Sequence, residues 1–291
     1  MIRQCTVRAP AKINLSLGVT GAREDGYHLI ESVMQTIGIF DIIRISADIR
    51  DHTSDLPDTV ISITGDSAKM PTDSSNTAFK AARLFLRELS LMDSAERSDL
   101  HRIDIDISKN IPQEAGLAGG SADAAGALYG LNFLMGDVIK RDTLAEIAAA
   151  TGADVPFCLA GGTCLCKGIG ELITPVKDIG SYDVVLFKPE YGMSTAMAYK
   201  AVDEAEDTMH PDTQGVLNAI DAGDVRGVMK AGGNIFEGPV FRRYPELADI
   251  TALLKNMDGS LGAAMSGSGT AVFGIFADGA AAAKASEILK E

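Results

Sequence analysis

Apolar residues recur along the chain with two different periods, which predicts a protein of mixed α and β structure. Between His101 and Ser108, isoleucines alternate with aspartates, and this period of two predicts a half-buried strand. From Asn76 to Ser90, apolar residues recur at helical spacing instead, which predicts an amphipathic helix capped by Asp73 or Ser75.

Further elements follow from the same patterns. Strands are expected over residues 4–19, 31–45, 60–64, 182–189 and 271–276, and helices over 124–132, 143–151, 244–257, 280–290 and from Ser194 onward. The first strand is expected to be interrupted at Ala9-Pro10-Ala11. A domain boundary is expected between Thr163 and Gly180, and we place it between a lobe of residues 1–165 and a lobe of residues 166–291.

The composition is typical of a soluble globular protein. The chain has 291 residues, of which 46% are apolar and 23% are charged. No apolar run approaches the length of a membrane span and no signal-peptide core is present, so we expect a cytoplasmic location. A formal net charge of −14 argues against a general nucleic-acid binder, but a nucleotide enzyme needs only a few local cations.

The cysteines and histidines do not have the spacing of a metal site. We expect the cysteines to be buried or idle thiols, because they have no zinc spacing and a disulfide framework is not expected in a chain of this size without export signals. The histidines are scattered, which argues against a histidine metal cluster. The cysteines are Cys5, Cys158, Cys164 and Cys166, and the histidines are His28, His52, His101 and His210.

A glycine-rich loop lies between the strand at 101–108 and the helix at 124–132. It runs from Ile111 to Ala125 and contains three glycines and Ser121. Glycine lets an anion approach the backbone N–H groups, and a helix N-terminus adds a partial positive charge, so we expect phosphate to bind here. A plain helix start with flexible glycines is the alternative. The loop is not a Walker loop, a Rossmann fingerprint or a protein-kinase motif.

Three other sets of polar residues are candidates for chemistry. Lys12 and Asn14 share one face of a predicted strand, which read alone indicates the solvent side of a sheet. Tyr27 and His28 follow a turn and could stack on a flat ring and hydrogen-bond its edge, or could be packing plus a surface imidazole. Asp154 lies in an apolar stretch bracketed by glycine and proline, where a carboxylate is either functional or caps the next helix.

Five stretches together resemble the GHMP small-molecule kinases. In the central loop the resemblance rests on Pro112, Gly116, Leu117, Gly120, Ser121 and Ala122. The other stretches are Pro10-Ala11-Lys12-Ile13-Asn14-Leu15, Asp25-Gly26-Tyr27-His28, Gly152-Ala153-Asp154-Val155-Pro156-Phe157 and Met265-Ser266-Gly267-Ser268-Gly269. The first two of these are similar to the GHMP kinases that phosphorylate 4-diphosphocytidyl-2-C-methyl-D-erythritol (CDP-methylerythritol) on the methylerythritol phosphate route to isoprenoids.

This resemblance implies a fold and a reaction. The fold would be α+β with two lobes, an N-terminal lobe like ribosomal protein S5 domain 2 and a ferredoxin-like C-terminal lobe. The reaction would be phosphorylation of the 2-hydroxyl group of CDP-methylerythritol by ATP with Mg²⁺. The enzyme would be a monomer or homodimer without a nucleic-acid or membrane partner.

The resemblance also implies residue roles. Asp154 would accept or orient the proton of the acceptor hydroxyl, and Lys12 would keep Asp154 ionised and offset charge developing on the transferred phosphoryl group. Ser121 would contact a phosphate oxygen or Mg²⁺. The residues that match the ATP loop are Lys109, Pro112, Gln113, Glu114, Ala115, Gly116, Leu117, Ala118, Gly119, Gly120, Ser121 and Ala122. The residues that match the substrate site are Asn14, Tyr27, His28, Thr195 and Tyr199, of which the aromatic ones would stack on and hydrogen-bond the cytosine.

Two departures from the family pattern and three alternatives remain. The loop reads Gly-Leu-Ala-Gly-Gly-Ser-Ala where other members carry Gly-Leu-Gly-Gly-Gly-Ser-Ser, so Ala122 lacks a second hydroxyl, and Phe236 stands where Leu is more usual. The alternatives are a GHMP kinase for mevalonate-like or amino-alcohol substrates, a catalytically dead nucleotide-binding regulator, and an RNA-binding module. The substrates of the first alternative carry no nucleobase that Tyr27 and His28 could contact. The RNA-binding alternative conflicts with the net charge of −14.

Overall fold

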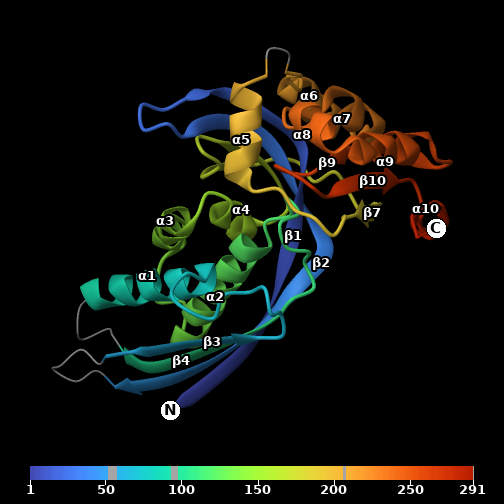
Figure 1. Ribbon diagram of the computed structural model, residues 1–291. Coiled ribbons are helices and arrows are strands. Elements are labelled where there is room, and N and C mark those ends of the chain that lie inside the picture. Colours follow the sequence, from blue (N-terminus) through green and yellow to red (C-terminus); the bar gives the residue numbers. More distant parts are fainter. Residues whose placement is uncertain (52–57, 93–97, 206–207, 291) are drawn as a thin grey trace. The chain divides into compact units, whose positions relative to one another are not determined.

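The structure, a computed structural model, describes residues 1–51, 58–92, 98–205 and 208–290 (Figure 1). The strands are β1 (Ile2–Ala22), β2 (His28–Asp51), β3 (Val60–Gly65), β4 (Ser98–Ser108), β5 (Thr163–Lys167), β6 (Leu172–Pro175), β7 (Asp183–Phe187), β8 (Gly233–Asn234), β9 (Ser260–Met265) and β10 (Val272–Phe276). The helices are α1 (Thr77–Leu91), α2 (Gly119–Met135), α3 (Arg141–Thr151), α4 (Val155–Ala160), α5 (Thr195–Asp203), α6 (Thr213–Ala222), α7 (Val225–Ala231), α8 (Glu237–Arg243), α9 (Pro245–Asn256) and α10 (Gly279–Ile288). His52 lies outside the described residues.

The chain folds into two compact units that are interleaved along the sequence. The first unit comprises Met1–Ala11, Gly38–Ile111 and Ala118–Ala160, and the second comprises Lys12–Ile37, Pro112–Leu117 and Gly161–Glu291. Strands β1 and β2 therefore contribute to both units. Because neither unit is one continuous segment, the expected lobe boundary at residues 165/166 stays a prediction.

The first unit is a sheet with helices packed on it. The strand order is β3-β4-β2-β1, with β4 antiparallel to β2 and parallel to β3. Helix α2 packs on α1 and α4 (Figure 1). A Cβ added at Gly130 would lie 2.5 Å from the Ile45 side chain, so the helix approaches the sheet at the distance that glycine allows.

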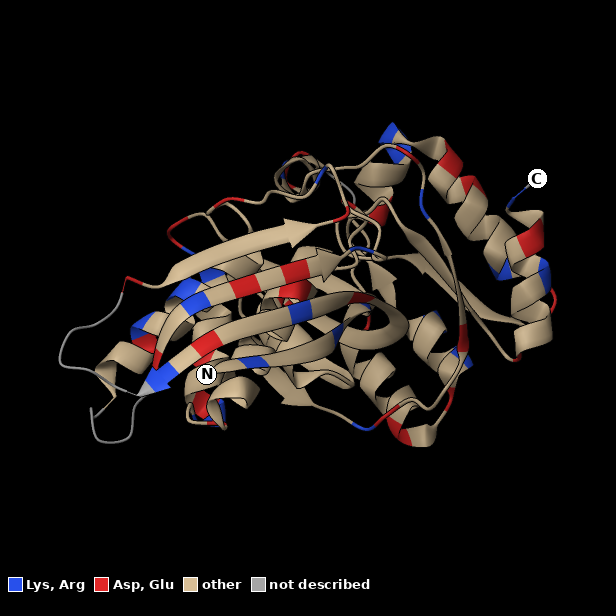
Figure 2. Ribbon diagram, turned by 90° about the horizontal axis from the view of Figure 1, so that it is seen from below, with Lys and Arg blue, Asp and Glu red and all other residues tan. Residues whose placement is uncertain are grey.

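Charged side chains of both signs mark this sheet, and Figure 2 shows blue and red bands along strands that lie near the N label. The ion pairs include Arg44–Asp106 at 3.1 Å and Arg102–Asp104 at 2.7 Å, and both pairs are about half exposed. In these two pairs the positive charge is matched by a neighbouring carboxylate, which weakens the local positive potential that a nucleic-acid binder uses.

The second unit contains an antiparallel sheet in the order β7-β10-β9. The central strand β10 is buried along its whole length, which follows from its continuous apolar sequence Val-Phe-Gly-Ile-Phe. Helices α7 and α9 pack on β9, and α10 packs on β7. In the same unit, the first part of β2 pairs with β5, and β8 pairs with β1 at Ser16 and Leu17.

Most expected elements are confirmed, and three details are corrected. Asn76, not Asp73 or Ser75, caps α1, because its side chain accepts the Ala78 N–H at 2.8 Å while Asp73 accepts from Ser75. Strand β1 runs through Pro10 without the expected interruption. Helix α2 begins at Gly119 rather than residue 124, because the last two glycines of the loop form its first turn.

No helix in the described ranges has the length and apolar character needed to cross a membrane.

Candidate functional site

Lys12 and Asn14 are buried, which contradicts the solvent-facing alternative. Their residues are 3% and 1% exposed, and Lys12 Nζ donates to Asn14 Oδ1 at 2.6 Å. The Asn14 amide nitrogen donates to Ser32 Oγ at 2.8 Å. Ile13 and Leu15 on the opposite face are buried as well, so β1 is covered on both sides here. A buried ammonium group is unfavourable unless it is paired or used, which makes this cluster a functional candidate.

Asn14 also joins two glycine-containing turns. Its Oδ1 accepts the Gly267 N–H at 2.9 Å, and Ser266 Oγ donates to the Gly116 carbonyl at 2.9 Å. A Cβ added at Gly116 would lie 2.0 Å from the Ser266 carbonyl oxygen. The central loop and the turn between β9 and β10 therefore touch backbone to backbone.

The central loop has an unusual backbone. Glu114, Gly116 and Ala118 all have positive φ, at 50°, 74° and 58°. Such alternation turns successive N–H groups toward one side, as in anion-binding nests. Ala118 occupies the N-cap of α2 without a side-chain cap, so the first N–H groups of a 17-residue helix are not capped by it. Ala118 is not a glycine, so its left-handed backbone conformation bears strain of about 1–2 kcal/mol.

A buried charge cluster, Asp41–Lys109–Asp123, adjoins the start of this loop in the first unit. Lys109 Nζ hydrogen-bonds both carboxylates, to Asp123 Oδ2 at 2.7 Å and to Asp41 Oδ2. Asp41 Oδ1 also accepts the N–H groups of Asn110 and Ile111, at 2.6 and 2.8 Å. Asp41 thus ties β2 to the residues that open the loop.

The cluster contains two carboxyl groups but only one ammonium group, so it has an excess negative charge when both carboxyl groups are ionised. Asp123 Oδ1 is buried and has no hydrogen-bond partner among the described residues. Burial raises the pKa of Asp123 to about 7, against the opposing effect of Lys109 and with a further increase from Asp41. Neither carboxylate was among the candidates expected from the sequence, although each is a lone charge in a run of small and apolar residues, which is a usable signal.

Asp154 and the end of the loop belong to the first unit. Asp154 directly precedes α4, and its carbonyl accepts the Cys158 N–H at 3.0 Å. This position suits helix capping as well as catalysis, so both interpretations of Asp154 stay open. Ser121 lies in the first turn of α2, and Ala122 is buried there.

The residues expected to bind the substrate base lie in the second unit. The rings of His28 and Tyr199 are stacked, 4.4 Å apart and 16° from parallel. His28 Nε2 lies 2.7 Å from Asp203 Oδ1, a contact that sequence reasoning missed because 175 residues separate the partners. Tyr27 is 61% exposed, and among the described residues no ring stacks on it. Thr195 Oγ1 lies 3.2 Å from Ser268 Oγ, so it reaches the C-terminal glycine turn.

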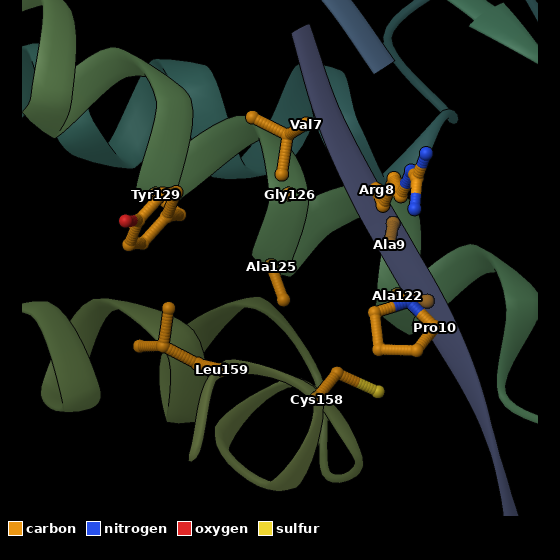
Figure 3. Close-up of a pocket in the computed structure, with 10 residues that line it drawn as sticks. All are labelled: Val7, Arg8, Ala9, Pro10, Ala122, Ala125, Gly126, Tyr129, Cys158 and Leu159. Atoms are coloured by element: carbon orange, nitrogen blue, oxygen red, sulfur yellow. The ribbon is translucent and has the colours of Figure 1, made fainter. Parts of the chain in front are cut away.

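A pocket of ≈ 200 Å³ lies in the first unit (Figure 3). Side chains of β1, α2 and α4 surround it, and it includes the partly buried thiol of Cys158 and the Arg8 side chain. Of the residues expected to bind ATP it contains only Ala122, so it is not the site inferred from the sequence. Its lining residues are Val7, Arg8, Ala9, Pro10, Ala122, Ala125, Gly126, Tyr129, Cys158 and Leu159.

Two family models match the chain. Residues 76–162 match the GHMP kinases N terminal domain, and residues 216–291 match the GHMP kinases C terminal model. A 4-diphosphocytidyl-2-C-methyl-D-erythritol kinase of Caldicellulosiruptor saccharolyticus is 40% identical over 98% of this chain and 92% of that protein. The enzyme of the same name from Clostridium botulinum is 42% identical over 93% of this chain and 90% of that protein.

Solved structures agree with these matches. A crystal structure of 4-(cytidine 5'-diphospho)-2C-methyl-D-erythritol kinase superposes with a TM-score of 0.75 at 29% identity, over 98% of this chain and 95% of that one. A homoserine kinase from Cytophaga hutchinsonii superposes with a TM-score of 0.74 at 20% identity, over 99% of this chain and 89% of that one. The second likeness concerns the fold alone.

Replacing Gly116 by alanine should separate steric collision from backbone strain. Gly116→Ala adds a Cβ at φ +74°, 2.0 Å from a backbone oxygen, whereas Gly136→Ala adds one at φ +86° with nothing within 4 Å. We expect Gly136→Ala to lower the free energy of unfolding by about 1–2 kcal/mol, and Gly116→Ala by about 1–3 kcal/mol more. Urea unfolding measures both, and equal losses would contradict the packing of the two turns.

The buried cluster should respond unequally to two chemically identical substitutions. Asp41→Asn places an amide N–H group against Lys109 or against two backbone N–H groups, and we expect a loss of about 3–5 kcal/mol, as for breaking a buried pair. Asp123→Asn replaces a carboxyl whose pKa is raised by a neutral amide that can turn its oxygen toward Lys109, so at about pH 4 we expect a change below about 1 kcal/mol, and at higher pH we expect the variant to be the more stable protein.

The same cluster predicts a pH dependence. Because the folded pKa of Asp123 is about 7 and its ordinary value is 3.8, the folded state binds more protons between these values. Its contribution to stability is therefore present below the unfolded pKa and is lost as the pH rises through 7. We expect the wild type to lose stability relative to Asp123→Asn between about pH 4 and about pH 7 in urea titrations, with little further loss above that range; parallel pH profiles would contradict the raised pKa.

Proposed function

The chain belongs to the 4-diphosphocytidyl-2-C-methyl-D-erythritol kinases, a branch of the GHMP kinases, and on this basis we propose that it transfers the γ-phosphoryl group of ATP to the 2-hydroxyl group of CDP-methylerythritol. The product would be the 2-phosphate, an intermediate of the methylerythritol phosphate pathway of isoprenoid biosynthesis. The α+β GHMP kinase fold expected from the sequence is confirmed by the same matches.

The observation that carries the proposal is a buried cation beside the glycine loop. The backbone N–H of Lys12 donates to the Leu117 carbonyl at 3.2 Å, so the strand that holds the lysine is bonded to the loop. Asn14 holds the ammonium group at 2.6 Å. A cation that is already desolvated and oriented can stabilise phosphate charge without reorganising during the reaction.

The loop is proposed to bind the ATP phosphates. Its positive-φ residues and the start of α2 offer backbone N–H groups. Lys109, which the resemblance assigns to the same site, is bonded to Asp41 and Asp123, so the phosphate charge is proposed to be met by the backbone N–H groups. Mg²⁺ is proposed to bind together with the ATP phosphates. The nearby carboxylates Asp41 and Asp123 already pair with Lys109, so Ser121, with its hydroxyl oxygen, is the protein ligand proposed for the metal. Mg²⁺ is commonly held through substrate phosphates, water and few protein ligands, and it neutralises charge on the β- and γ-phosphoryl oxygens.

Asp154 and Lys12 are proposed to act on the acceptor. The acceptor is a tertiary alcohol and a poor nucleophile, so a carboxylate that takes or orients its proton accelerates attack on the γ-phosphorus. We assign that role to Asp154. Lys12 is assigned to charge that develops between the attacking oxygen and the transferred group.

The base site is proposed to involve Tyr27, His28 and Tyr199. The ring of Tyr199 already covers one face of His28. We therefore place the cytosine against the edge of the His28 ring and not between the rings of His28 and Tyr199. Tyr27, which is mostly exposed, is available to stack on the base. Asn14 and Thr195 are assigned to further substrate contacts.

The cytoplasmic location and the monomeric or homodimeric state of the protein also stay predictions.

Asp154→Asn tests the assigned proton acceptor. Asparagine caps a helix as well as aspartate does, so the fold of α4 should be kept, but the amide cannot take a proton. With ATP, Mg²⁺ and CDP-methylerythritol, we expect kcat to fall about 10²- to 10⁴-fold, with the KM for ATP and the thermal midpoint close to those of the wild type.

Glu146→Gln is the matched control, because it neutralises an exposed carboxylate on the neighbouring helix α3. Its kcat should equal that of the wild type. An Asp154→Asn enzyme with wild-type kcat would sink the assignment, and a folded enzyme that loses ATP binding instead would move Asp154 to the nucleotide site.

A further inference from the structure

Helix α5 presents three side chains at intervals of four residues, Thr195, Tyr199 and Asp203, which places them on one face of the helix. Each reaches another segment of the second unit. Thr195 meets Ser268, Tyr199 stacks on His28, and Asp203 meets the edge of His28. The first two match family substrate contacts, but nothing in the sequence resemblance assigns a role to Asp203.

The imidazole ring of His28 is held in two directions. Asp203 Oδ1 bonds Nε2 at 2.7 Å in the direction of the ring edge, and Tyr199 covers one face. Tyr199 is supported in turn by Phe236, which meets it edge-on at 4.9 Å and is 1% exposed. This supporting ring is the residue that departs from the usual leucine. The orientation of the remaining ring nitrogen, Nδ1, is therefore set by its neighbours.

The contact with Asp203 also decides where the imidazole proton lies. An ionised carboxylate accepts hydrogen bonds and donates none, so the short contact requires a proton on Nε2. In neutral imidazole the lone pair is then on Nδ1. Among the described residues none hydrogen-bonds Nδ1, so this acceptor is available to a ligand.

We propose that Asp203 is a positioning residue that presents His28 Nδ1 as a hydrogen-bond acceptor for the exocyclic amino group of cytosine, and so makes the enzyme select cytidine over uridine substrates. Cytosine carries an amino donor where uracil carries a carbonyl acceptor. Against a fixed Nδ1 lone pair, the amino group forms a hydrogen bond and the carbonyl oxygen meets repulsion. This inference rests on the proposed function, because it assumes a cytidine substrate.

The test compares turnover of CDP-methylerythritol with that of its uridine counterpart. For Asp203→Ala we expect the ratio of the two kcat/KM values to fall by about tenfold or more, as for the loss of one oriented hydrogen bond, while the KM for ATP is unchanged. Asp203→Asn should keep most of the preference, because the amide oxygen can accept the same Nε2–H.

Glu204→Gln is the matched control, because it removes the neighbouring carboxylate, which is exposed and pairs only loosely with Lys200 at 3.8 Å. Its preference should equal that of the wild type. Unchanged preference in Asp203→Ala would overturn the proposal. Equal loss in Asp203→Ala and Asp203→Asn would overturn it as well, because the hydrogen bond to Nε2 would then not be the cause.

Two measurements separate this inference from the reaction itself. Nitrogen-15 NMR of histidine-labelled protein, with His28→Gln for assignment, should find His28 protonated at Nε2 and unprotonated at Nδ1; protons on both nitrogens would overturn the proposal. Calorimetric titration with CDP and with UDP should give tighter binding of CDP in the wild type and a smaller difference in Asp203→Ala. If neither methylerythritol substrate is turned over but this difference holds, the proposed reaction fails while the base-reading role stands.

Discussion

Backbone atoms of two distant glycine turns touch at Gly116 and Ser266, and this contact is the constraint on which the candidate site depends. Only hydrogen fits between them, because a Cβ at Gly116 would lie 2.0 Å from the Ser266 carbonyl oxygen. The side-chain oxygen of Asn14 accepts hydrogen bonds from the Gly267 N–H and from the Lys12 ammonium group, so both buried donors are satisfied. A loop that binds phosphate needs exposed N–H groups, and it can be rigid only if its carbonyls and its flanks are held from behind. The turn from β9 to β10 provides that support.

The site is built from groups that oppose folding when taken alone. An ammonium group, an amide and several hydroxyl groups are buried around Asn14, and an unbalanced carboxylate is buried at Asp123. Ala118 adds strain from its left-handed backbone. Such groups are tolerated when hydrogen bonds satisfy them, and a network that is fully bonded is also rigid. The polar strand face of β1 and the strained loop are consistent with stability given up for a preorganised phosphate site.

The sequence predicted the local elements well and the long-range partners poorly. Period-two, helical and continuous apolar patterns located β4, α1 and β10, because each depends on neighbours along the chain. The glycine loop was found because its residue types are rare in combination. The burial of Lys12 was misjudged in the local pattern, since alternation along one strand does not reveal whether a second layer covers its polar face. Asp203 gave no local signal, because its function depends on a partner 175 residues away.

The most direct measurement is ADP release by the purified protein supplied with ATP, Mg²⁺ and CDP-methylerythritol, with mevalonate and homoserine as acceptors in parallel reactions. We expect turnover with CDP-methylerythritol and none with mevalonate or homoserine. Only the first acceptor carries a nucleobase that can contact the edge of His28 and the exposed ring of Tyr27. Turnover with mevalonate or homoserine in its place would keep the phosphoryl chemistry but contradict the cytosine site. Binding of ATP without turnover of any acceptor would contradict the kinase assignment itself.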